Sequence, residues 1–132
     1  MIKDIPFPKI NDVKIAVGKE INEKGESDWY VFVINNKPIT LSNLLVVSDA
    51  TEKEDGSGRK TSTLRHFIEE VEVGKFSKIE RIDPAVFGFY NRFWLSFYIG
   101  RELFDKKFVL HPFNEFDLQQ IPELEMEGRE AF

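Results

Sequence analysis

The stretch FWLSFYIGRELFDKKFVL, residues 93–110, decides the fold class of this chain. Hydrophobic residues occupy every odd position from Phe93 to Ile99, and the even positions carry Trp, Ser and Tyr. After Gly100 the alternation resumes and continues to Leu110. Two alternating runs joined by a short turn that contains glycine predict a β-hairpin. Charged residues on both faces of the second run indicate that it lies near the edge of a sheet.

Further stretches have the composition or alternation of strands: Val13–Val17, Trp29–Ile34, Leu44–Ser48 and Phe76–Asp83. Two others are ambiguous. Leu64–Val73 has helical spacing after the possible caps Ser62 and Thr63, but it ends in a strand-like Val-Glu-Val. Phe113–Leu124 is compatible with a short helical turn that stops at Pro122. About seven short strands predict an all-β sandwich with at most one short helix.

The chain length of 132 residues corresponds to one domain, so we expect residues 1–132 to form a single β-sandwich. The polar segment Asp49–Thr63 lies between apolar stretches and is predicted to be a long hairpin connection. From about residue 123 the chain is rich in glutamate and poor in apolar residues, which predicts a frayed tail.

Composition excludes several classes of site and partner. The net charge of −5 argues against a nucleic-acid or anionic-membrane partner. The chain has no cysteine and only two histidines, which excludes disulfides, thiol nucleophiles, Cys-type zinc sites and three-His metal sites. We therefore expect no metal and no cofactor. No apolar run has the length of a signal peptide or a membrane span, so the expected location is cytoplasmic.

Residues 31–48 resemble the early hairpin of immunoglobulin-like bacterial modules, in which a strand ends in an Asn-rich turn and is followed by a Leu-x-Asn-hydrophobic-x-Val strand. The resemblance extends over residues 29–110, since residues 74–83 and the hairpin of residues 93–110 are similar to the later strands of such modules. It implies an antiparallel immunoglobulin-like β-sandwich.

A second resemblance, carried by residues 60–66 and 87–94, is to uncharacterised bacterial proteins that carry a phenylalanyl-tRNA synthetase alpha-chain label. A class II synthetase core is much longer than this chain. The stretch Gly88–Arg92 also lacks the glycine pattern of the third synthetase motif. A synthetase activity is therefore not supported, and no catalytic residue is carried over.

One cluster of basic and hydroxyl side chains stands out in this acidic sequence, and it suggests an anion-binding site made by Arg59, Lys60, Ser62, Arg65 and His66. The alternative is a solvated loop whose hydroxyls cap the next element. His66 could act with Glu69 or Glu70 as an acid–base pair or as metal ligands. This would require that residues 64–73 form a helix and, for a metal, that a further ligand is present. No nucleophile elbow or phosphate-binding loop occurs, so no catalytic residue is assigned and an enzyme is not the favoured class.

The residues between Phe87 and Tyr98 are unusually aromatic, and both faces of the predicted strand carry rings. A sandwich has only one core face per sheet, so Tyr90, Trp94 and Tyr98 need a cover. The cover is either another part of this chain, with the Pro-Phe-Pro segment 6–8 and residues 113–121 as candidates, or a partner protein. We expect a protein-interaction or self-association module, with a homodimer as one form; the alternative is a binder of small anions through residues 59–66.

Overall fold

The computed structural model describes residues 12–132, and in it the aromatic stretch forms the predicted hairpin. Strands β6 (Tyr90–Ile99) and β7 (Glu102–Leu110) pair antiparallel, and Gly100 turns the chain with a φ of +60°, which favours glycine. The other elements are β1 (Val13–Ile21), β2 (Ser27–Asn35), β3 (Leu41–Thr51), β4 (Leu64–Val71), β5 (Phe76–Arg81), β8 (Gln119–Ile121), β9 (Met126–Ala131) and the 3₁₀ turns η2 (Pro84–Val86) and η3 (Pro122–Leu124).

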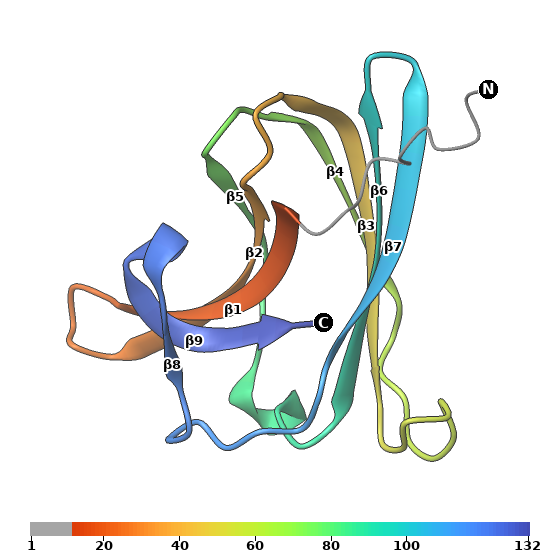
Figure 1. The fold of residues 1–132 in the computed structure, drawn as a ribbon. Coiled ribbons are helices and arrows are strands. Elements are labelled where there is room, and N and C mark those ends of the chain that lie inside the picture. Colours follow the sequence, from red (N-terminus) through yellow and green to blue (C-terminus); the bar gives the residue numbers. More distant parts are fainter. Residues whose placement is uncertain (1–11) are drawn as a thin grey trace.

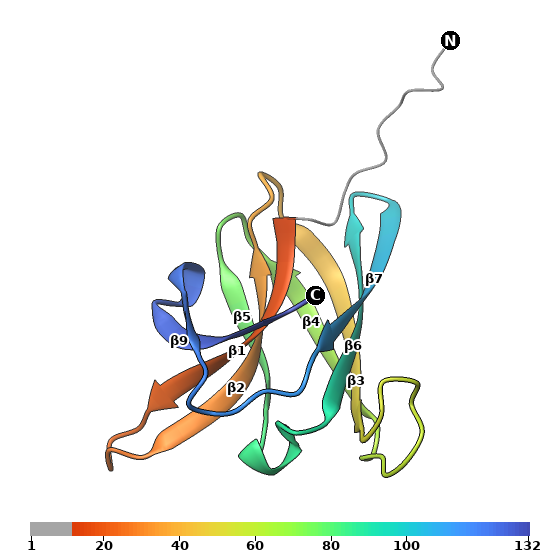
Figure 2. The same cartoon turned by 60° about the horizontal axis from the view of Figure 1, so that its bottom comes forward.

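The strands form two antiparallel sheets that pack face to face (Figures 1 and 2). The first sheet has the order β5-β2-β1-β9-β8, and the second has the order β4-β3-β6-β7. This arrangement confirms the all-β sandwich. Among residues 12–132, no helix is long and apolar enough to cross a membrane.

Alternation along β6 decides which side chains enter the core. Phe93, Leu95 and Phe97 are buried between the sheets, whereas Trp94 and Tyr98 point away from them. Opposite them, Val31 and Val33 of β2 are fully buried and belong to the same cluster. The inward face of the aromatic hairpin is therefore structural, and only its outward face is available for binding.

The two sheets are joined along both sides of the sandwich. On one side, a short turn at residues 72–75 leads from β4 in the second sheet to β5 in the first. On the other side, the backbone amide of Val109 donates to the carbonyl oxygen of Phe132 at 2.6 Å, and the amide of Phe132 donates back at 2.9 Å. The gap between the sheets is thereby bridged at β7 by the residue that follows β9.

The segment from residue 123, predicted to fray, is part of the sheet, so that prediction was wrong. Its strand β9 pairs with β1, with Ala131 opposite Ile15 and Gly128 opposite Gly18. Ile121 and Leu124 pack with Ala16, Phe32 and Ile34 in a second apolar cluster. In β9 the glutamates Glu127 and Glu130 keep contact with solvent, while Gly128 and Ala131 beside them are buried.

The two ambiguous stretches form no α-helix. Residues 64–71 are an edge strand, in which Ile68 packs on the core while most of the other side chains are exposed. Their polar character therefore comes from the edge position and not from a helical face. Residues 113–124 contain a turn closed by the Asp117 amide and the Asn114 carbonyl, then β8 and η3. Phe113 stacks on Phe87 in the core and so does not cover Trp94. The other suggested cover, residues 6–8, lies outside the described residues.

Candidate functional site

The outward side of the second sheet carries an apolar surface, here called the outer face. Strand pairing arranges its central side chains in two neighbouring rows that run across all four strands. The first row is Arg65, Val47, Trp94 and Lys107, and the second row is Phe67, Leu45, Ser96 and Asp105. Beyond the second row, Tyr98 lies opposite Leu103.

Several large apolar side chains of the outer face are open to solvent. The exposed fractions are 65% for Phe67, 56% for Leu103, 38% for Leu45 and 37% for Tyr98. Trp94 is half-buried, since the Arg92 guanidinium lies 4.9 Å and the Lys107 ammonium 5.5 Å from its ring centroid. Such cation–π contacts shield part of the ring from solvent. A groove of about 400 Å³ runs between the two rows.

Of the three aromatic residues suggested as an interface, the structure places two together. Trp94 and Tyr98 belong to the central part of the outer face; alternation predicted that they share a face but not that this face points outward. Tyr90 lies at the other end of β6, where its ring meets the edge of His111 at a centroid distance of 5.6 Å. The neighbours of Trp94 on β3, β4 and β7 were not identified from the sequence, because their register is a tertiary property.

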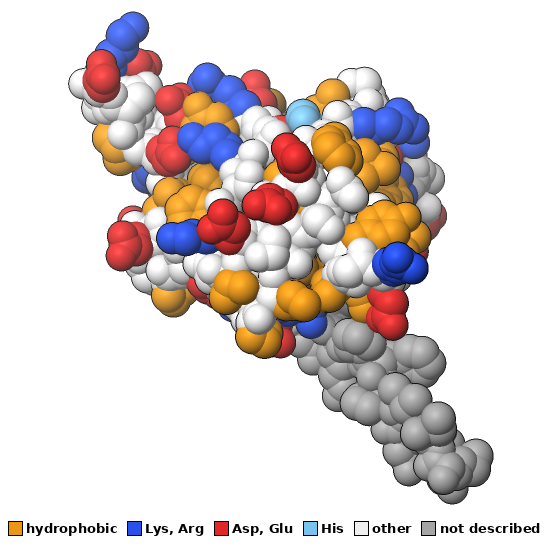
Figure 3. All heavy atoms as spheres, turned by 90° about the horizontal axis from the view of Figure 1, so that it is seen from above, with side chains coloured by type: hydrophobic (Ala, Val, Ile, Leu, Met, Phe, Trp, Pro, Cys, Tyr) orange, Lys and Arg blue, Asp and Glu red, His pale blue; other side chains and the backbone are white. Residues whose placement is uncertain are grey.

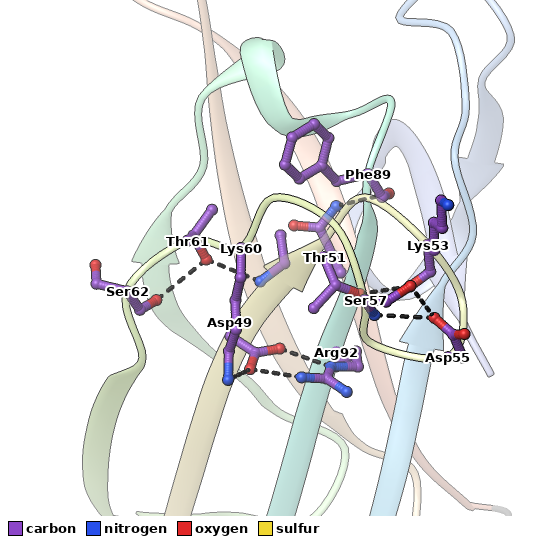
Figure 4. A network of polar contacts seen from close by, with 12 residues as sticks. Asp49, Thr51, Lys53, Asp55, Ser57, Lys60, Thr61, Ser62, Phe89 and Arg92 are labelled. Atoms are coloured by element: carbon purple, nitrogen blue, oxygen red, sulfur yellow. Dashed lines mark hydrogen bonds and ion pairs between the residues drawn. The ribbon is translucent and has the colours of Figure 1, made fainter.

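The basic loop between β3 and β4 is tied down by its own polar contacts (Figure 4). The Glu52 amide donates to the Arg59 carbonyl, and the Thr61 amide donates to the Ala50 carbonyl, which closes the loop as the predicted hairpin connection. The Arg59 guanidinium lies 2.9 Å from the Glu52 carboxylate. Lys60 Nζ lies 3.4 Å from Asp49 Oδ2. Arg59 and Lys60 therefore each already have an anionic partner.

Asp49 is the centre of this polar network. Arg92 binds its carboxylate through two hydrogen bonds, from Nε to Oδ1 at 2.7 Å and from a terminal nitrogen to Oδ2 at 2.8 Å. Burial alone would raise the pKa of Asp49, but the hydrogen bonds and charges of Arg92 and Lys60 outweigh it and hold that pKa below its ordinary value. The buried carboxylate thus fixes the loop to β6.

The structure does not bring the five suggested anion-binding residues together. Arg65 and His66 are consecutive on a strand, so Arg65 joins the outer face while His66 points toward the inter-sheet side. Ser62 precedes the strand and faces a cavity between the sheets. Only Arg59 and Lys60 remain side by side in the loop. A helix would have placed Ser62, Arg65 and His66 on one surface, and that helix is absent.

A second polar cluster, not foreseen from the sequence, lies where β4 and β5 approach each other. Ser48 Oγ donates a hydrogen bond of 2.7 Å to Glu80 Oε1, and His66 Nε2 lies 3.2 Å from the same oxygen, at ion-pair distance but without hydrogen-bond geometry. Burial raises the pKa of Glu80, and the contacts with Ser48 and His66 only partly oppose this. Ser48 and Glu80 border an inter-sheet cavity of about 150 Å³.

This cluster does not have the geometry of a nucleophile activated by a base. Ser48 donates to the carboxylate and not to the imidazole, so His66 is not placed to take the serine proton. Within residues 12–132, no group of three His, Cys, Asp or Glu side chains is arranged to hold a metal ion. The sequence signal for this cluster is incomplete: Ser48 continues the core-facing alternation of Leu44 and Val46, whereas Glu80 lies opposite the buried Val31 because the pairing of β2 with β5 shifts register there.

The chain matches no protein-family model, no curated protein and no solved structure at a level that indicates relatedness. Its function is therefore argued from the geometry of its own surfaces.

Proposed function

We propose that this protein is a non-enzymatic interaction module that binds a protein surface, its own or another, through the outer face. The observation that carries the proposal is the run of exposed apolar side chains over β4, β3, β6 and β7. Within residues 12–132, no strand or 3₁₀ turn forms a third layer over this sheet (Figures 1 and 2). Exposed apolar patches of this kind mark interaction sites in soluble proteins.

As part of the same proposal, the sandwich belongs to the immunoglobulin-like class. Matched by their positions in the two sheets, β5-β2-β1 facing β4-β3-β6-β7 correspond to strands E-B-A facing C′-C-F-G of that class, and strand D has no counterpart among the described residues. The hairpin of β8 and β9 extends the first sheet beyond β1. The outer face is then the C′CFG surface. The proposal keeps the cytoplasmic location expected from the lack of an apolar run of signal-peptide or membrane-spanning length, with which the cysteine-free composition agrees.

The rival function, binding of small anions by the basic loop, has less support. An anion at this loop would have to displace Glu52 from Arg59 or Asp49 from Lys60, and both of those pairs are close. Arg65 belongs to another surface. The opposite end of the sandwich, seen from above in Figure 3, intermixes acidic, basic and hydrophobic side chains in its described part, so it offers no alternative continuous basic surface for a polyanion.

The test removes exposed apolar area without touching the core. In the double variant Phe67→Ser and Leu103→Ser, the outer face loses its two most exposed apolar side chains. Phe116→Ser is the matched control, because Phe116 is 88% exposed in the loop before β8. We expect only the double variant to lose binding, measured both as self-association by light scattering and as recovery of cross-linked partner proteins. Equal behaviour of the two variants in both assays would refute the proposal.

A further inference from the structure

The charges of the outer face are arranged so that the face is complementary to itself. On β7, Asp105 and Lys107 are two positions apart and therefore point to the same side of the sheet. Lys107 ends the row of Trp94, and Asp105 ends the neighbouring row of Ser96. Between these rows, Val47 and Leu45 provide the apolar centre on β3. If a second copy lies over this face with its two rows in exchanged positions, a positive charge lies over Asp105 and a negative charge lies over Lys107.

We propose that the outer face binds a second copy of this chain, face to face, about a two-fold axis that crosses the strands between these two rows. This inference rests on the function proposed above and names its partner. Rotation about that axis places each row over the neighbouring row of the other copy. Asp105 then meets Lys107 of the second copy, Lys107 meets Asp105, and Leu45 meets Val47. Each of these contacts therefore occurs twice, once on either side of the axis, as a two-fold interface requires.

The charges also select this axis over the other face-to-face arrangement. A two-fold axis parallel to the strands would place β4 over β7, with each row over its own counterpart. Arg65 would then face Lys107 of the second copy, and like charges at an interface are strongly unfavourable. With the axis across the strands, β4 of one copy lies over β4 of the second copy. The Arg65 guanidinium of each copy then lies over the exposed Phe67 ring of the other, which is a favourable contact.

The size of the outer face sets the strength of the dimer. Four strands spaced about 4.8 Å apart and about six residues of 3.4 Å each give a surface of roughly 20 by 20 Å, or about 400 Å² per copy in projection. Stable dimers bury about 800 Å² or more per partner, so this interface belongs to the weak, reversible class. We expect association that depends on protein concentration and falls with added salt, because the two ion pairs lie at the rim.

The experiment reverses one charge at a time. In Asp105→Lys, each symmetric contact would join two lysines, and in Lys107→Asp it would join two aspartates. Each single variant should therefore self-associate at least tenfold more weakly than the original protein. An equimolar mixture of the two variants should associate again, because every Lys of one copy meets an Asp of the other. The double variant Asp105→Lys, Lys107→Asp should likewise recover self-association.

The readout is the mass in solution, by light scattering or sedimentation equilibrium, over about a hundredfold range of concentration. Lys24→Asp is the control, since Lys24 is an exposed cation in the turn between β1 and β2. Circular dichroism confirms that each variant is folded. Recovery in the mixture supports the proposed axis. A monomeric original protein, single variants that associate like it, or a mixture that stays monomeric would each overturn the inference. The Phe67, Leu103 variant separately decides whether another protein uses the face.

Discussion

Gly128→Ala is a sharp test of the unexpected role of the C-terminal strand. Gly128 of β9 lies opposite Gly18 of β1, and a Cβ atom at residue 128 would overlap the carbonyl oxygen of Val17 and lie 3.2 Å from the Gly18 Cα atom. These atoms are backbone within a paired strand, so no side-chain rotation relieves the overlap. The substitution should push β9 away from β1.

The expected cost follows from what β9 holds in place. Overpacking a well-packed site costs about 1–3 kcal/mol. Separation of β9 would also loosen the burial of Ile121 and Leu124, each contributing about 1.5–3 kcal/mol when fully buried. Because part of that burial survives local relaxation, we expect a loss of about 3 kcal/mol in the free energy of unfolding. For a domain of this length that corresponds to a Tm lower by about 12 °C.

Thermal denaturation measures the change, with Gly88→Ala as the control. A Cβ atom added at Gly88 would meet no other residue within 4 Å, and Gly88 has no positive φ, so its substitution should leave Tm nearly unchanged. Hydrogen exchange of the Val17 and Arg129 amides reports on the β1–β9 pairing itself. If Gly128→Ala melts within about 2 °C of the control and those amides stay protected, the packing argument for β9 is wrong.

Three further predictions concern the polar clusters. Glu80→Gln should become increasingly stable relative to the original protein as pH rises from about 4 to 7, because the pKa of Glu80 is raised in the folded state and its ionisation therefore weakens folding. Urea titrations at several pH values measure this, and a stability difference that does not grow with pH would refute it. Asp49→Asn should cost about 3 kcal/mol at neutral pH by leaving Arg92 unpaired. That cost should shrink as pH falls through the lowered pKa of Asp49, and a pH-independent difference would contradict this. Arg59→Ala should change the free energy of unfolding by less than about 0.5 kcal/mol, because the side chain is 77% exposed; a larger loss by calorimetry would mean that the loop is packed.

Local patterns predicted the parts of the fold that depend on neighbouring residues. The hairpin of β6 and β7 follows from alternation and a glycine turn, both readable within residues 93–110. Edge and terminal strands were harder to recognise. The polar residues of β4 are exposed at a sheet edge, and their spacing is also typical of the polar side of a helix. The frequent glutamates of β9 are also typical of an unstructured tail. Both are strands because a neighbour in the sheet offers hydrogen bonds, which is long-range information.

The candidate sites divide in the same way. Alternation placed Trp94 and Tyr98 on one face of their strand but left open which face is buried, and the structure shows that theirs points away from the core. Their apolar neighbours Phe67, Leu45 and Leu103 depend on strand register, which no short stretch encodes. The contact of Ser48 and His66 with Glu80 depends further on how two different sheets approach each other. Composition suggested a basic cluster, but the carboxylate that pairs with each cation depends on the three-dimensional structure and could not be predicted from the sequence.

The pairing of β1 with β9 also has a consequence for how the chain is made. Ile15 and Ala131 are partners although more than about a hundred residues separate them, so this contact closes the largest loop among the described strands. During synthesis β1 emerges well before β9 and keeps one unpaired edge until the ribosome has released residues 126–131. An unpaired edge is a template for pairing with other chains. Folding yield should therefore be most sensitive to translation rate and chaperone supply in the interval between the emergence of β1 and that of β9.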